Sequence, residues 1–312
     1  MSFARNVKEE VLDHIFTPEQ TIMLLSGFIK YNGEFLYTNK GTILRLSSQS
    51  NKITRQILTL LKTIYDGNIE ISIKQTNKLR KDKVYELLIA ENVHDFLSKY
   101  YIYDIDKNDK IIRINLKGDF DHSWLRAYIS GVFIAVGSVN SPATSNYHLE
   151  FQTKDLESAE YIRDLLNQFE FGFKVIAKKN KYICYIKRSL YVSDFLRFID
   201  APKSVLEFEN TRITRDVRNN INRMTNIDIY NQHKSENAGA KQTQQIELIK
   251  NNKLFSELSE KAQNLANIRL EHQDASFSEL EKMMNEKGIE ITKSGISNLF
   301  KIIAKLAESI GG

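Results

Sequence analysis

The sequence predicts an α+β protein in which two tandem lobes share one αββαββα order, followed by a linker helix and an all-α domain. One observation is a nine-residue pattern that occurs twice, as Leu25–Gly33 and again as Ile129–Gly137. Another is that helical and strand-like periods follow each copy in the same succession, which indicates duplication of a whole unit. A third is that the period-2 alternation typical of strands stops near residue 254, where helical patterns replace it.

Each copy of the pattern places a Ser-Gly pair inside an apolar helix and a second glycine six residues later. Small residues let two helix backbones approach closely, so we expect the two helices to pack against each other. The terminal glycines, Gly33 and Gly137, suit a left-handed C-cap. The residues just before them, Asn32 and Val136, should then lie where the paired helices converge.

The segments after each copy define two lobes, which we place at residues 1–110 and 111–205. The first lobe is expected to contain a strand at 42–46, a helix around 53–64 and strands at 69–73 and 84–89. The second lobe is expected to contain a strand at 148–151, a helix at 159–169, strands at 173–177 and 182–186, and a last helix at 192–199.

Composition places the chain among ordinary globular proteins, with 42% hydrophobic and 27% charged residues over 312 positions. No apolar run is long enough for a membrane span, and the first residues do not resemble a signal peptide. The single cysteine, Cys184, excludes an internal disulfide and a cysteine zinc cluster, and core filling is favoured over a reactive thiol. The net charge of +5 permits a polyanionic partner without requiring one. We expect a cytoplasmic protein with no cofactor and no metal.

The C-terminal domain, placed at 251–312, has three helical patterns that suit a helix-turn-helix. The first runs to about Leu270, the second starts at a Ser276–Glu279 capping box and ends at Gly288, and the third begins near Thr292. The third helix has an apolar face and a polar face without acidic residues, whose groups can reach base edges and phosphates. The candidate DNA contacts on it are Lys293, Ser294, Ser297, Asn298, Lys301 and Lys305. A plain three-helix bundle with a solvated last helix is the alternative.

A basic linker helix and hinge are placed at 206–250, between the lobes and the C-terminal domain. Its arginines are spaced to share part of one helix surface, beside an apolar line at Ile213, Val217 and Ile221. The arginines are Arg212, Arg215, Arg218 and Arg223. They suit contacts with DNA phosphates, or a connector held by ion pairs with Glu207, Glu209 and Asp216. The polar stretch 235–245 is expected to be a hinge or a frayed helix junction.

The nine-residue patterns resemble the LAGLIDADG motif of homing endonucleases, and their order with later blocks resembles the WhiA family. Those blocks are Leu125–Phe133, Tyr147–Phe151, Arg215–Asn219, Asn222–Arg223 and Lys293–Ile296. The resemblance covers essentially the whole chain. It implies a bilobal LAGLIDADG-like saddle, a linker helix and a C-terminal helix-turn-helix, in bacterial regulators of sporulation and cell division that bind DNA without cutting it.

The residues before the terminal glycines independently argue against catalysis. LAGLIDADG nucleases place a carboxylate there in each helix, and this pair holds divalent metal ions at the scissile phosphates. Asn32 is neutral and Val136 has no side-chain oxygen, while Asp119 and Asp121 lie at the other end of the second helix. We therefore predict that the protein is not an enzyme. Ile227 stands where the family typically carries a cysteine, and we expect this to change packing only.

The leading hypothesis is a nucleoid-associated transcription regulator of cell division, chromosome organisation or sporulation-type genes, with double-stranded DNA as its partner. A second hypothesis makes the repeated domain a scaffold that docks on another transcription regulator or a sigma factor. A third is nucleoid association with little sequence preference. Lysines in the predicted strands of the repeated domain could contact DNA or could be solvated edge residues. These are Lys74, Lys78, Lys83, Lys174, Lys178 and Lys187.

Overall fold

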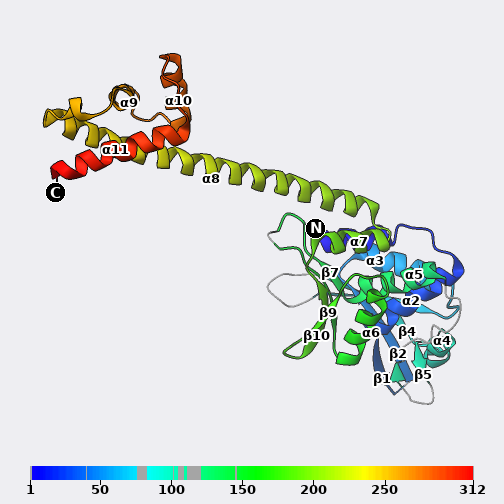
Figure 1. Cartoon of the computed structure of the whole chain (residues 1–312). Coiled ribbons are helices and arrows are strands. Elements are labelled where there is room, and N and C mark those ends of the chain that lie inside the picture. Colours follow the sequence, from blue (N-terminus) through cyan, green and yellow to red (C-terminus); the bar gives the residue numbers. More distant parts are fainter. Residues whose placement is uncertain are drawn as a thin grey trace. The chain divides into compact units, whose positions relative to one another are not determined.

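The computed structural model describes residues 2–39, 41–75, 83–100, 102–104, 109–110, 121–144 and 146–311. The chain divides into two compact units, Met1–Arg215 and Asp216–Gly312. The first unit holds all the described strands and the second is helical (Figure 1). The expected α+β class is confirmed.

The first lobe is a four-stranded antiparallel sheet with its helices, in the strand order β1-β2-β4-β3. Its elements are α1 (Phe3–Val11), α2 (Pro18–Asn32), β1 (Glu34–Thr38), β2 (Gly41–Ser48), α3 (Asn51–Leu61), β3 (Ile69–Gln75), β4 (Lys83–Ile89) and α4 (Val93–Lys99). The two-residue strands β5 (Tyr103–Asp104) and β6 (Asp109–Lys110) pair with each other after it.

The second lobe repeats this plan, with the strand order β7-β8-β10-β9. Its elements are α5 (His122–Val136), β7 (Gly137–Val139), β8 (Leu149–Thr153), α6 (Leu156–Asn167), β9 (Lys174–Lys178), β10 (Lys181–Ile186) and α7 (Ser189–Phe198). The equivalent order of helices and strands confirms the duplication. The first strand of each sheet, β1 or β7, was missed because it starts directly after the helix and lacks a clear apolar alternation.

The helices that carry the repeated pattern, α2 and α5, pack backbone against backbone. A Cβ atom at Gly27 would run into the carbonyl oxygen of Tyr128, and one at Gly131 would run into that of Leu24. Leu24, Leu25 and Ile29 are fully buried around this contact. The predicted close packing of the two helices is confirmed, and it depends on Gly27 and Gly131 because only glycine leaves room for the opposite backbone.

The terminal glycines do not adopt the left-handed conformation that we predicted for them. Gly33 has φ −64° and ψ 135°, and Gly137 has φ −77° and ψ 151°, so both are extended. Each helix passes directly into a strand instead of ending in a Schellman turn. Glycine is required for space: a Cβ atom at Gly33 would lie 2.6 Å from the Ile29 oxygen, and one at Gly137 would enter the Phe133 ring.

The sheets cover one apolar core in which Cys184 is fully buried. Burial raises the pKa of its thiol, which disfavours the reactive thiolate and agrees with a packing role. Among the described residues, no helix combines the length and the apolar composition of a bilayer-spanning segment.

Helix α8 (Pro202–Asn251) runs unbroken from the first unit into the second. At its start the Glu10 carboxylate accepts hydrogen bonds from the backbone nitrogens of Lys203 (2.6 Å) and Ser204 (3.0 Å). The hinge expected at 235–245 is wrong, because these residues are helical. Gly239 allows the helix to touch the Gln273 carbonyl, and Ile246 and Ile249 are fully buried. The small and polar residues thus form a packing surface.

The second unit completes a helix-turn-helix around the end of α8. It contains a 3₁₀ turn (Phe255–Glu257), α9 (Glu260–Glu271), α10 (Phe277–Glu286) and α11 (Lys293–Gly311). The Ser276–Glu279 capping box is present, and Gly288 has φ +79° where α10 ends. Both sequence signals are confirmed.

Candidate nucleic-acid interface

The tips of α2 and α5 carry no carboxylate, and Asn32 has a structural role there. Its amide nitrogen donates to the Ser47 carbonyl (3.0 Å), and its oxygen accepts from the Ser47 backbone nitrogen (2.8 Å). A carboxylate could accept but could not donate, so aspartate would leave the Ser47 carbonyl without this partner. Val136, at the other tip, is half-buried.

Among the described residues, no carboxylates from elsewhere replace the missing pair at these tips. Asp121 caps the opposite end of α5, accepting from the Ser123 backbone nitrogen at 2.8 Å. This hydrogen bond lowers the pKa of the Asp121 carboxyl. Asp119 lies outside the described residues. Within the described ranges, no group of three or more His, Cys, Asp or Glu side chains could hold a metal ion.

Helix α11 separates an apolar face from a polar one. Ile296, Phe300 and Ile303 are buried in the core of the second unit. Five candidate contacts are exposed and Ser297 is half-buried. The exposed five are Lys293, Ser294, Asn298, Lys301 and Lys305. Ser294 also hydrogen-bonds the Thr292 hydroxyl at 2.9 Å, so it shares the capping of the helix. Whether these residues contact DNA stays a prediction.

Ile302 is an exposed residue of α11 that the sequence analysis did not include among the candidate DNA contacts. Its side chain is 52% exposed, and it lies four residues after Asn298 on the outer side of α11. Apolar side chains at such positions contact the thymine methyl group in the major groove. The sequence did contain an indication: Ile302 falls outside the helical period of the buried residues, whereas the neighbouring Ile303 fits it.

Two polar residues, both absent from the sequence-based candidates, hold α11 in place. Asn285 spans the turn between α10 and α11: its oxygen accepts from the Ile291 nitrogen at 3.0 Å, and its amide donates to the Ile291 carbonyl at 3.4 Å. Arg269 is 1% exposed and donates to three backbone carbonyls, and its guanidinium lies 5.4 Å from the centre of the Phe300 ring. The carbonyls belong to His272 (3.2 Å), Gln273 (3.0 Å) and Ala275 (2.7 Å).

The four linker arginines fall into two pairs. Arg212 binds the Glu209 carboxylate at 2.6 Å, and Arg215 donates to the Thr144 carbonyl while lying 4.4 Å from the centre of the Tyr147 ring. Arg218 and Arg223 are exposed, and no ion pair to either is found in the described part of the chain. Arg212 and Arg215 therefore fit the interpretation of a connector held by intramolecular contacts. Arg218 and Arg223 fit the interpretation of a helix that contacts DNA phosphates.

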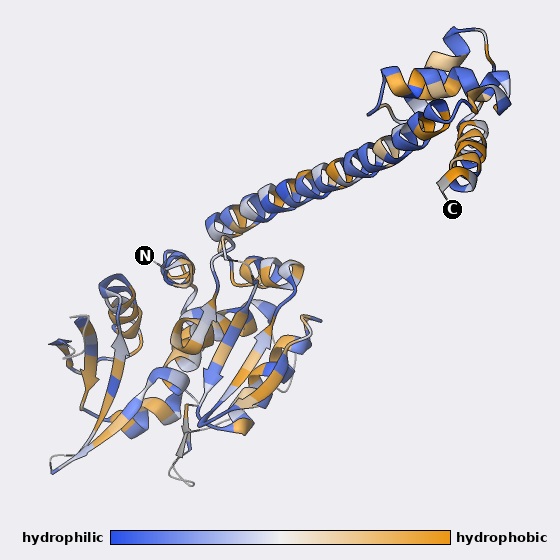
Figure 2. Ribbon diagram, turned by 90° about the vertical axis from the view of Figure 1, so that its left-hand side faces the viewer, coloured by the Kyte–Doolittle hydropathy of each residue, from blue (hydrophilic) through white to orange (hydrophobic). Residues whose placement is uncertain are grey.

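The middle of α8 is surrounded by solvent, and hydrophobic residues interrupt its hydrophilic surface (Figure 2). Ile213, Val217 and Ile221 are 54%, 51% and 56% exposed. Ile227, further along the same helix, is 59% exposed. It lies in neither buried cluster of the described residues, and the expectation that it only changes packing stays a prediction.

The first sheet pairs its charges on the face opposite the buried Leu44 and Leu46. Arg45 lies 2.5 Å from Glu34 and 3.8 Å from Glu86, and Lys74 lies 2.9 Å from Glu86. Lys83 is exposed on β4, whereas Lys78 lies outside the described residues. The positive charges on this face are thus largely neutralised by carboxylates.

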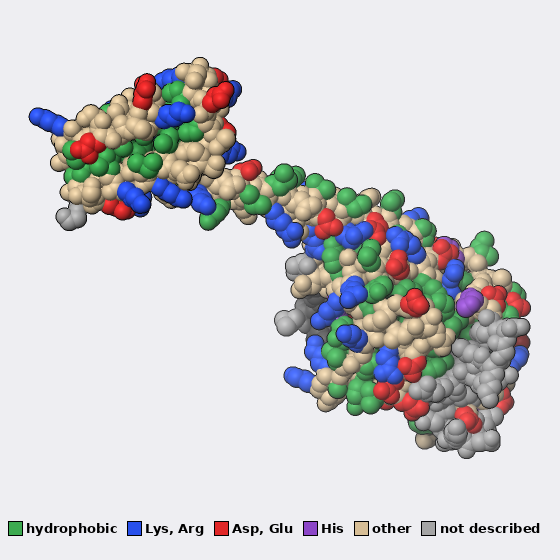
Figure 3. All heavy atoms as spheres, viewed as in Figure 1, with side chains coloured by type: hydrophobic (Ala, Val, Ile, Leu, Met, Phe, Trp, Pro, Cys, Tyr) green, Lys and Arg blue, Asp and Glu red, His purple; other side chains and the backbone are tan. Residues whose placement is uncertain are grey.

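The second sheet carries more basic than acidic side chains. Figure 3 shows them gathered around β9 and β10. Lys178 and Lys181 are direct cross-strand neighbours, an arrangement that costs stability because like charges face each other. Lys179, with φ +51°, forms the turn between them. Lys179 and Lys181 were not among the lysines named from the sequence, because the sequence alone did not show that they lie at the tip of a β-hairpin.

A basic pocket of about 430 Å³ lies at the other end of the same sheet. Basic side chains and tyrosines line it: Lys174, Lys187, Arg188, Tyr185 and Tyr191. The Lys187 ammonium lies 5.3 Å from the centre of the Tyr185 ring. The structure thus brings Lys174 and Lys187 together with aromatic surface, which is the combination that nucleic-acid-binding grooves use.

These features define a class: a two-lobed LAGLIDADG-like protein without the carboxylate pair, joined to a helix-turn-helix. Three family descriptions match the chain: the WhiA N-terminal LAGLIDADG-like domain at 18–103, the WhiA LAGLIDADG-like domain at 125–218, and the WhiA C-terminal HTH domain at 221–307. The chain belongs to the WhiA family.

Relatives and solved structures match over the full length. Proteins named "Probable cell division protein WhiA" are 32% identical in Lysinibacillus sphaericus, 33% in Enterococcus faecalis and 34% in Clostridium tetani, each covering 99% of this chain and 98% of the relative. The crystal structure of full-length WhiA from Thermatoga maritima is 27% identical with a TM-score of 0.58, covering 100% of both chains. The structure of a WhiA N-terminal LAGLIDADG domain, 24% identical with a TM-score of 0.50, covers 64% of this chain and 90% of that one, and shows the shared fold.

Proposed function

We propose that this protein is a sequence-specific, DNA-binding transcription regulator that acts in cell division and chromosome organisation. The observation that carries the proposal is α11, whose solvent side offers amide, hydroxyl and ammonium groups while Ile296, Phe300 and Ile303 anchor the other side. A helix of this kind reads bases in the major groove. The printed names of the relatives, which refer to cell division, support the biological setting.

The two lobes take part without catalysis in this proposal. Nuclease chemistry on this fold needs oxygen ligands for a metal ion at both helix tips. Asn32 is occupied with Ser47, and Val136 provides no ligand. The purified chain, incubated with its preferred duplex and Mg²⁺ or Mn²⁺, should leave both strands intact. Metal-dependent scission would contradict this part of the proposal.

The test of recognition uses duplexes selected from a random pool by the full chain. Asn298→Ala should reduce the ratio of specific to random affinity by about tenfold, since an amide can pair with one base edge. Lys301→Ala should weaken binding to both duplexes and lower the salt slope by about one unit.

The exposed Lys261 on α9 provides the control, and Lys261→Ala should match the wild type in both measurements. An unchanged specificity ratio in Asn298→Ala, Ser297→Ala and Lys293→Ala together would remove α11 as the reading helix. Equal affinity of the wild type for selected and random duplexes would instead indicate nucleoid association with little sequence preference.

A further inference from the structure

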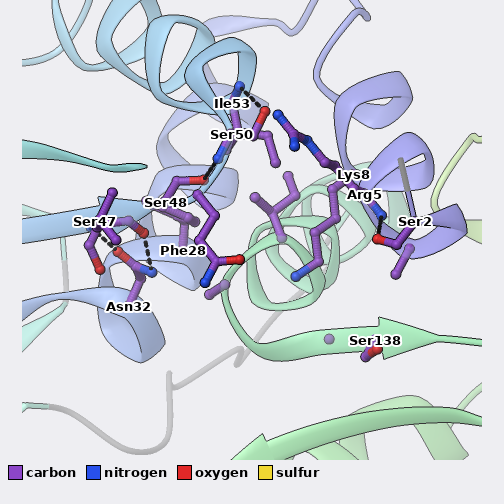
Figure 4. A pocket seen from close by; sticks show the side chains of 16 residues that line it. Ser2, Arg5, Lys8, Phe28, Asn32, Ser47, Ser48, Ser50, Ile53 and Ser138 are labelled. Carbon is purple, nitrogen blue, oxygen red and sulfur yellow. Dashed lines mark hydrogen bonds between the residues drawn. The ribbon is translucent and has the colours of Figure 1, made fainter. Parts of the chain in front are cut away.

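The tips of α2 and α5 open into a pocket of about 540 Å³ (Figure 4). Side chains from both lobes line it, and none of them is a carboxylate. They include Arg5, Lys8, Asn32, Ser47, Gln49 and Ser138. The volume is in the range of small-ligand sites and exceeds what a single water molecule needs.

Lys8 reaches from α1 into this pocket toward the last turn of α5 (Figure 4). Its ammonium lies 5.8 Å from the centre of the Phe133 ring. No ion pair to it is found among the described residues. Burial lowers the pKa of Lys8 to about 8, so the side chain still carries its charge at pH 7. Lys8 is half-buried, and a partly desolvated charge without a carboxylate partner has a cost that a bound anion would relieve.

The surroundings of Lys8 favour an anion in three further ways. Arg5 is ion-paired with Glu9 through its Nε (2.9 Å), so it adds hydrogen-bond donors through its two terminal nitrogens and no unpaired charge. The first turns of α1 and α3 both line the pocket, and helix N-termini attract negative charge. Gln49 is exposed and Ser138 half-exposed, and both carry polar groups with donor hydrogens.

The charge at this position is the reverse of that in a nuclease. There, two carboxylates hold a cation between the helix tips; here, Lys8 reaches the same tips, and Arg5 lines the Ser50 side of the pocket (Figure 4). The negative ends of the α2 and α5 dipoles favour the Lys8 ammonium in the way that they would favour a metal ion. An anion then completes the arrangement by pairing with Lys8.

We propose that this pocket is a phosphate-binding site, which takes the phosphate group of the DNA backbone or of a free phosphorylated molecule. Phosphate presents several acceptor oxygens, which matches ammonium, guanidinium, hydroxyl and amide donors arranged around one cavity. The site is independent of α11 and of the function proposed for it.

The first experiment titrates the full-length chain with inorganic phosphate at constant ionic strength, by calorimetry and by thermal unfolding. Wild type and the control Lys62→Met, an exposed lysine outside the pocket, should bind phosphate saturably and gain thermal stability from it. Lys8→Met should bind it at least about tenfold more weakly. Without phosphate, Lys8→Met should unfold at a higher temperature than wild type, because a partly desolvated charge is removed.

A second variant tests the pocket without removing the lysine. Ser138→Asp adds a carboxylate to the wall of the pocket that Lys8 lines, so it should abolish phosphate binding and raise the unfolding temperature. The site is refuted if wild type shows no saturable phosphate binding at millimolar concentrations. It is equally refuted if Lys8→Met and Ser138→Asp both bind phosphate as wild type does.

The source of the phosphate is separated by comparing a mononucleotide with a duplex. If the DNA backbone provides it, Lys8→Met weakens duplex binding and the mononucleotide binds no better than inorganic phosphate. If a free molecule provides it, Lys8→Met loses mononucleotide affinity and keeps the duplex affinity of wild type. Either result supports the pocket, and α11 variants should leave phosphate binding unchanged.

Discussion

The two sheets share one strand order but differ in the charges they carry. The strands of the first sheet hold three basic side chains against three acidic ones: Arg45, Lys74 and Lys83 against Glu34, Glu70 and Glu86. Those of the second hold three basic side chains against one acidic: Lys174, Lys178 and Lys181 against Glu150. Glu150 is itself hydrogen-bonded by His148 (2.8 Å) and Gln152 (2.6 Å). Across the described strands, only the second sheet offers an excess of positive charge.

This difference shows that duplication preserves the interior and lets the exterior diverge. Leu44 and Leu46 in one lobe, and Leu149 and Phe151 in the other, are buried at matching positions because the core depends on them. The opposite faces carry no such constraint. The net charge of the chain is a sum over both lobes, so it cannot show that the excess of basic side chains is concentrated on the second sheet.

The largest expected effect comes from removing lysines of the second sheet. If this sheet contacts the DNA backbone, Lys174→Ala combined with Lys178→Ala should lower the salt slope of duplex binding by about two units. Lys74→Ala, on the first sheet, should leave the slope unchanged because that ammonium is already neutralised by Glu86. The measurement is duplex affinity of the full chain from low to physiological salt. Equal slopes for the double variant and wild type would limit DNA contacts to the second unit.

A smaller effect should separate paired from unpaired arginines on α8. Arg218→Ala removes an exposed charge, so the salt slope should fall by about one unit if it touches a phosphate. Arg212→Ala removes a guanidinium that is held by Glu209 and should leave the slope unchanged, while it costs about 1 kcal/mol of unfolding free energy or less. Identical salt slopes in Arg218→Ala and wild type would show that Arg218, like Arg212, does not contact a DNA phosphate.

The sequence was sufficient to predict the duplicated lobes, the close helix pair and the helix-turn-helix, because each depends on local periodicity or on glycine spacing. Failures arose where the outcome depends on distant residues. Gly239 was interpreted as part of a flexible hinge. In the fold, glycine is needed at this position because a Cβ atom would run into the Gln273 carbonyl oxygen. Arg269 looked like one more surface charge, and its burial depends on a loop whose three carbonyls no pattern reveals.

The same limit applies to the candidate site. The absence of carboxylates at positions 32 and 136 could be read directly from the sequence. The pairing of Lys74 with Glu86 could not, because it requires the register of β3 with β4. Lys8 was overlooked because nothing in the α1 segment indicates that its side chain reaches the tips of helices far along the chain.

The smallest expected effect converts the first sheet toward the second. Glu86→Gln leaves Arg45 with Glu34 as its remaining partner and leaves Lys74 without its carboxylate. Non-specific duplex affinity at low salt should rise by about two- to fivefold. The unfolding free energy should fall by about 1–3 kcal/mol, because Glu86 is buried and pairs with both Arg45 and Lys74. Glu70→Gln makes the same change in net charge at an exposed position and serves as the control. If both variants gain affinity equally, net charge alone explains the result. A larger gain in Glu86→Gln means that carboxylate pairing on the first sheet is what keeps its cations from DNA.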